Sequence, residues 1–374
     1  MPRPPRPRAG RFLLASLLAA SLVVALLAAA SPVAGAGGEL PGLKVMTLYD
    51  GDGNIICQTG FGLGLGDEYL DEGNVLWRVD KITGPTTAVA VFVRRVDLSS
   101  AVQEFQLSLA GIPLAANGQS SQVGIYHTHN DESYVPSEGA ESDPNGQGGV
   151  YRVGDAFSSG LEKSGLRVNH SLASHLPHDA GAYERSRRTA TEVLRGSAAI
   201  FDVHRDAAPP EAYARKVDGK QVTQIMIVIG RENPQADSNL AFAEALKASA
   251  DSSHPGLIRG ILKTGGDFNQ DLSSRALLLE VGAHTNRRQE AESGVTALAG
   301  VVPNVLGVGG AGQGVGAWRA VGIIAIIVVV GGGLWLYVAT GGSWREAWRK
   351  LRSLGEEFAG YLGRRRRGGG PRRR

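Results

Sequence analysis

The stretch VGIYHTHNDESY, residues 123–134, starts as an apolar, strand-like run and ends in polar side chains that bind metals. His127 and His129 are separated by one residue, and Glu132 follows three positions later. Side chains two positions apart on a strand point to the same face of a sheet. We therefore expect both histidines to face one site, although a polar loop after a strand would also fit these residues.

Two more apolar runs end in the same kind of residue: AAIFDVH ends at His204, and ALLLE ends at Glu280. In open α/β sheets the ligand site lies beyond the carboxyl ends of the strands, so these ends are expected to converge. Zinc suits the set, because a catalytic zinc takes three imidazole or carboxylate ligands and one water. A further carboxylate can then transfer the proton of that water, and Glu280 is the candidate.

Strand and helix signals alternate around these residues, from 121 to about 300, which predicts a domain built as an α/β layered sheet with flanking helices. The expected strands are 123–127, 166–170, 198–204, 224–230 and 276–282, and the expected helices are 149–165, 182–195 and 239–251. Residues 39–118 carry several short β-rich runs separated by turn signals, which predict a small β-rich module before this domain.

Both ends of the chain point to a membrane. Residues 1–36 join an arginine-rich start to an apolar run and an Ala-x-Ala pattern, as in a signal peptide or an uncleaved N-terminal anchor. A glycine-rich linker is expected at 301–319 and a transmembrane helix at 320–340, a segment without charge and about 20 residues long. The basic tail, 343–374, then indicates a cytoplasmic C-terminus and an extracytoplasmic catalytic domain.

The net charge of +3 comes from these basic ends, so the exported part of the 374-residue chain is acidic. Nucleic-acid binding, which needs a basic surface, is therefore not expected. Cys57 is the one cysteine and cannot form an intramolecular disulfide. Stability outside the membrane must come from a hydrophobic core or a metal.

The motifs also resemble a known family. YHTHNDESY, GDAFSSGLEKSG, HDAGAYERSRRTATEVL, IFDVHRDA, MIVIGRENP and LLLEVGAHTN occur in the order and spacing of the stage II sporulation protein P family, over about residues 123–293. That family is similar to zinc-dependent N-acetylmuramoyl-L-alanine amidases. The resemblance implies an amidase-like layered sheet and a bound Zn²⁺ ion.

The resemblance also implies roles for individual residues. It assigns His127 and His204 as zinc ligands and Glu280 as the catalytic acid/base. The carboxylate ligand is Glu132, in preference to Glu138 or Glu141, because the segment where such amidases carry this acid reads GGVYRVG here. A last group is expected to bind substrate or to orient the ligands: Arg205, Asp206, Asn286 and His129. Of these, His129 is also an alternative zinc ligand in place of His127.

By this resemblance the chain is a membrane-tethered peptidoglycan hydrolase of sporulation (engulfment), which cleaves the amide between N-acetylmuramic acid and L-alanine. Cross-link endopeptidase activity, and partnership with the sporulation lytic transglycosylase and engulfment membrane proteins, are also implied. The alternatives are a zinc peptidase that acts on stem peptides only and a non-catalytic cell-wall-binding module.

Overall fold

The computed structural model describes residues 38–40, 42–110 and 121–308, together with the single residues 341, 343 and 345. The predicted N-terminal segment 1–36 and the predicted span 320–340 lie outside these residues, as do most of the predicted linker and of the basic tail. Within the described part of the chain, no helix is both long and apolar enough to cross a membrane.

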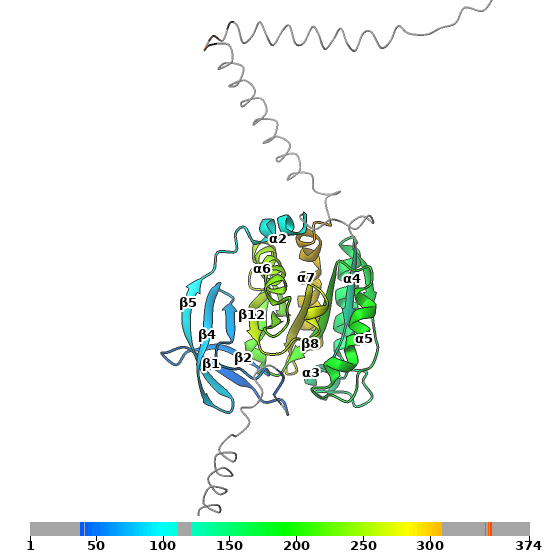
Figure 1. Ribbon diagram of the computed structural model, residues 1–374. Helices are drawn as coiled ribbons and strands as arrows, with labels where there is room; N and C mark the ends of the chain where they lie inside the picture. The colour runs from blue at the N-terminus through cyan, green and yellow to red at the C-terminus, as the bar shows by residue number, and fades with distance from the viewer. Residues whose placement is uncertain are drawn as a thin grey trace, which may run out of the picture. The chain divides into compact units, whose positions relative to one another are not determined.

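Eleven of the described strands form one sheet (Figure 1), in the order β2-β1-β5-β4-β3-β12-β11-β13-β8-β6-β7. The strands are β1 (Met46–Tyr49), β2 (Ile55–Thr59), β3 (Glu68–Asp71), β4 (Val75–Gly84), β5 (Thr87–Arg95), β6 (Gln122–Tyr126), β7 (Arg167–His170), β8 (Ala199–Asp206), β11 (Ile225–Gly230), β12 (Ile258–Thr264) and β13 (Ala276–Ala283). Strands β13, β8, β6 and β7 run parallel, whereas β11 is antiparallel to β13. The expected α/β layered sheet is therefore present.

The β-rich region before residue 118 joins this same sheet. β3 pairs antiparallel with β12, with Leu70 opposite Ile261. The sequence analysis did not predict strand β12, which makes this pairing possible. The predicted small module thus has no sheet of its own in the part that the structure describes.

Helices cover one face of the central strands. They are α4 (Val150–Lys163), α6 (Ala236–Ser253) and α7 (Arg288–Val305), with α2 (Ala101–Ala110) at their side. Phe157 of α4, Phe242 of α6 and Leu298 of α7 are fully buried in one core with Phe201 of β8 and Ile227 of β11. Because α7 continues to Val305, the first residues of the predicted 301–319 linker are helical.

The other face is covered in two parts. Helix α5 (Ala182–Leu194) packs on β6 and β8, with Val193 against Ile200. The curved β1–β5 strands cover β11 and β13, where Leu48 shares a core with Leu278. A cleft lies between these two covers, and its walls include the start of α5 and residues near β1.

Five short elements complete the described fold. They are the helix α3 (Val135–Glu138), the hairpin of β9 (Ala214–Val217) with β10 (Lys220–Thr223), and the 3-10 turns η1 (Pro210–Ala212) and η2 (Gln270–Leu272).

Candidate metal centre

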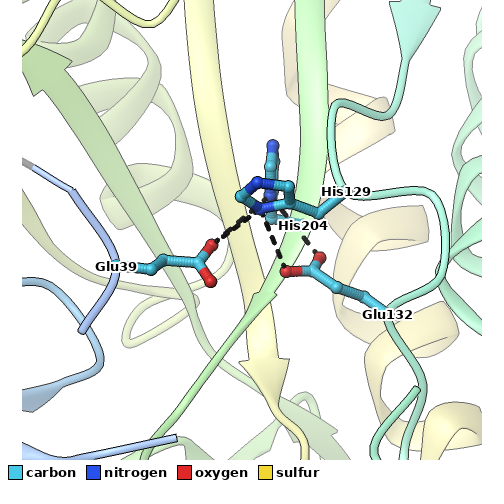
Figure 2. A group of neighbouring side chains, drawn as sticks. All are labelled: Glu39, His129, Glu132 and His204. Atoms are coloured by element: carbon cyan, nitrogen blue, oxygen red, sulfur yellow. Dashed lines mark hydrogen bonds and ion pairs between the residues drawn. The ribbon is translucent and has the colours of Figure 1, made fainter. Parts of the chain in front are cut away.

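Four side chains meet at the bottom of the cleft (Figure 2): Glu39, His129, Glu132 and His204. One ligand atom from each lies within 4.8 Å of the others. They come from three places in the chain, namely a short extended segment before β1, the loop after β6, and strand β8. No sequence-local pattern joins these places.

Local structure fixes three of the four side chains. His204 lies on β8 two residues after Asp202, and alternation along the strand points both side chains to the cleft face. The backbone N–H of Glu132 donates to the His129 carbonyl at 3.2 Å, which closes a turn and brings these two side chains together. The N–H of Arg205 then donates to Oε2 of Glu132 at 3.0 Å, so that the loop is fastened to β8.

The distances between the donor atoms come within about 0.3 Å of those in a tetrahedral zinc shell. Nδ1 of His129 lies 3.1 Å from Oε1 of Glu39 and 3.7 Å from Oε1 of Glu132. Nδ1 of His204 lies 3.5 Å from Oε2 of Glu132 and 3.9 Å from Oε1 of Glu39. Ligands about 2.0–2.2 Å from a tetrahedral zinc lie about 3.3–3.6 Å apart. The four donors are therefore spaced to surround one ion.

The surroundings of His204 also fit a metal ligand. Its Nδ1 is buried, and no described residue forms a hydrogen bond with it. Its Nε2 lies 3.0 Å from Oδ1 of Asp202 in an ion-pair contact. Asp202 is itself held by Thr128, whose N–H donates to Oδ1 and whose hydroxyl donates to Oδ2. A carboxylate behind a histidine in this way orients the ring of a metal ligand.

The cluster favours positive charge. Burial alone would lower the pKa of His204, but the charges of Asp202 and Glu132 raise it well above its ordinary value. Burial would likewise raise the pKa of Glu132, but Arg205 and His204 hold it below its ordinary value. Two carboxylates facing two imidazoles thus require cationic charge between them, which protons or one divalent cation can provide.

Glu280 lies next to this cluster. It pairs in register with His204 on the neighbouring parallel strand, so the two side chains share the cleft face. Glu280 is fully buried, and neither carboxylate oxygen hydrogen-bonds to any described residue. Burial, with the nearby charge of Asp206, raises the pKa of Glu280 well above its ordinary value. A buried carboxyl group with a raised pKa beside a metal site is suited to accept and return a proton.

Comparison with known proteins shows the family of the chain. Residues 90–303, more than half of the chain, match the family described as Stage II sporulation protein P (SpoIIP). The chain belongs to the SpoIIP family. Stage II sporulation protein P of Bacillus subtilis (strain 168) is 32% identical to it over 208 residues, which cover 50% of this chain and 52% of the relative. The chain thus aligns with about half the length of this curated relative.

In this SpoIIP-family chain, His127 lies outside the cluster, although the sequence predicted it as a ligand. Its Nδ1 is 2.8 Å from the Val203 carbonyl and its Nε2 is 2.9 Å from Nε2 of His170, close to Gly154 of α4. Strand β6 ends at Tyr126, so strand alternation does not continue to His129. The expectation that the two histidines face one way is therefore wrong, and His129 is the member of the pair that joins Glu132 and His204.

Of the other predicted residues, Arg205 and Asp206 lie beside the cluster, and Asn286 lies in the loop after β13. Arg205 is buried, with Nη1 3.4 Å from Oε1 of Glu132. Asp206 accepts hydrogen bonds from the N–H of Gly60 at 2.6 Å and the hydroxyl of Tyr213 at 2.7 Å. Asn286 closes the loop after β13 by accepting from the N–H of Ala283. These contacts hold the walls of the site in place.

Glu39 is the member of the SpoIIP-family cluster that sequence reasoning missed. It lies 90 residues before His129 and outside the matched range, in a segment expected to open the β-rich region. It follows no strand-end pattern, so no signal in the sequence pointed to it.

The cleft above the cluster has a volume of about 620 Å³. His178 and Tyr183 line it beside His129, and the hydroxyl of Tyr183 has no hydrogen-bond partner among the described residues. The ring of Tyr183 packs edge-on against His129 and roughly parallel to the ring of His204. The cleft is thus large enough for part of a polymer, and the buried Tyr183 hydroxyl lies behind its wall without a hydrogen-bond partner among the described residues.

Proposed function

We propose that the chain is a zinc-dependent N-acetylmuramoyl-L-alanine amidase that hydrolyses peptidoglycan during sporulation. The observation that carries the proposal is the pairing of a metal-spaced cluster with Glu280, a buried carboxyl group next to His204 that no described residue hydrogen-bonds. A structural metal site has no need of such a group, and leaving it buried destabilises the fold. Membership of a sporulation family supplies the context.

In this proposal His129, Glu132 and His204 hold the zinc ion. When bound, zinc supplies Lewis-acid activation of a water molecule and of the amide carbonyl. Glu280 accepts the proton of the water and returns it to the nitrogen of the leaving L-alanine, because its carboxylate lies beside His204 and has no hydrogen-bond partner among the described residues.

Product analysis tests the reaction. Full-length chain, solubilised in detergent and loaded with zinc, is incubated with purified sacculi, and the soluble products are separated and weighed by mass spectrometry. An amidase releases peptides with a free L-alanine amino terminus and leaves glycan without peptide. Shortened stem peptides still attached to muramic acid would indicate a stem peptidase instead, and binding to sacculi without products would indicate a non-catalytic wall-binding module.

Membrane tethering is a second part of the proposal. The uncharged segment 320–340 and the arginine-rich tail behind it support a single span with the tail in the cytoplasm. The catalytic residues would then lie outside, where the sporulation lytic transglycosylase and engulfment membrane proteins are proposed partners. A reporter that is active only in the cytoplasm, fused after Arg374, should be active in cells, and an inactive reporter with normal expression would contradict this topology.

A further inference from the structure

Glu39 differs from the other three donors in its exposure. The side chains of Glu132 and His204 are completely buried and that of His129 is 4% exposed, whereas that of Glu39 is 20% exposed. Its Oε2 lies 3.5 Å from Nε2 of His178 at the cleft wall. Glu39 therefore approaches the cluster from the cleft, which is the side from which a substrate must enter (Figure 2).

The segment that carries Glu39 is also held by fewer backbone hydrogen bonds than strand β8, which carries His204. Residues 38–40 are held by two backbone hydrogen bonds, from Leu40 N–H to the Gly60 carbonyl at 2.7 Å and from Gly62 N–H to the Gly38 carbonyl at 2.9 Å. A single bridge, Glu39 to Phe61, completes the pairing. Water can replace such bonds at an edge, whereas His204 is fixed within a central strand.

The number of donors sets what the site can do. A zinc ion with three protein ligands keeps one position for water and substrate, whereas four protein ligands are typical of closed, structural sites. His129, Glu132 and His204 supply three without Glu39. With Glu39 as the fourth, no position is left for the reacting water.

We infer that Glu39 is a removable fourth ligand that closes the metal centre, so that the segment of residues 38–40 must leave the cleft before water and substrate can reach the ion. This inference rests on the proposed function for the identity of the substrate, but not for the closure itself. Glu39 lies outside the family match, so the closing residue belongs to a part of this chain that the match does not cover.

Cobalt substitution tests the closure, because the visible spectrum of Co²⁺ reports its coordination without any need for turnover. The full-length chain is loaded with Co²⁺ and titrated with acetohydroxamate, a small molecule that binds open metal positions. We expect Glu39→Ala to keep one equivalent of Co²⁺ and to bind acetohydroxamate about tenfold or more tightly than the unchanged chain, since an open population of a tenth or less weakens apparent affinity by that factor. Glu39→Gln should fall between them.

Glu141→Ala is the matched control, because Glu141 also lines the cleft but lies outside the cluster. Its spectrum and its acetohydroxamate affinity should equal those of the unchanged chain. Equal affinities in Glu39→Ala and the unchanged chain, or loss of Co²⁺ from both Glu39 variants, would overturn the closure. Absence of peptidoglycan hydrolysis with a large change in acetohydroxamate affinity would contradict the proposed reaction while leaving the closure standing.

Discussion

His127 and His129 are two residues apart, yet they lie in opposite kinds of surroundings. His127 faces helix α4, where burial and the neighbouring His170 lower its pKa to about 3. His129 faces carboxylates, and although burial alone would lower its pKa, Glu39 and Glu132 raise it above its ordinary value. His127 is hydrogen-bonded to Val203 of β8 and His170 of β7. His129 lies beside two carboxylates and is a candidate metal ligand. The difference shows that the turn after a strand, more than the residue type, decides the role.

The largest loss of activity is expected from a change at Glu280, which lies beside the cluster that contains His129. Glu280→Gln keeps the volume of the side chain but removes its basicity, so turnover of peptidoglycan should fall by about 10² to 10⁴, which is the usual contribution of a positioned acid/base. The zinc content should stay at one equivalent by elemental analysis. A variant that hydrolyses at the normal rate, or one that has lost its zinc, would remove Glu280 from its proposed role.

The two histidines themselves give the sharpest test. His129→Ala should weaken zinc binding by about a hundredfold or more, because one of three inner ligands is lost. The matched variant His127→Ala should keep one equivalent of zinc and instead lower the free energy of unfolding by about 1–3 kcal/mol, since its buried hydrogen-bond partners are left unpaired. Zinc competition titrations and urea unfolding of the zinc-loaded chains measure both. If His127→Ala loses zinc and His129→Ala keeps it, His127 is the metal ligand and His129 is not.

A smaller effect is expected from Asp202, which stands behind His204. Asp202→Asn should weaken zinc binding by about 10- to 100-fold, since the carboxylate that orients the ligand ring becomes a neutral amide. Asp271→Asn makes the same change in a partly exposed ion pair with Arg187, outside the cluster, and should leave zinc binding unchanged. Equal zinc affinities in the two variants would show that Asp202 does not support the ligand.

Much of the fold followed from local pattern. The strands that carry His204 and Glu280, and the amphipathic helix α4, were predicted because apolar residues recur with strand or helix periods. Strand β8 runs two residues beyond the predicted end at His204. Strand β12 and helix α7 were missed. The sequence IRGILKT of β12 interrupts its apolar residues with charged ones, and α7 carries three glycine or proline residues, so neither matched a single period.

The sequence by itself determined the layered α/β class. It also put His129, Glu132 and His204 among the candidate residues and placed Glu280 on a strand. Only the tertiary structure decided between His127 and His129, because that choice depends on where β6 stops and on which neighbours the following turn meets. It alone brought Glu39 to the cluster, through backbone pairing with Gly60 and Gly62. Contacts between residues far apart in the chain leave no periodic signal, so the ligand set appears only when the sheet has assembled.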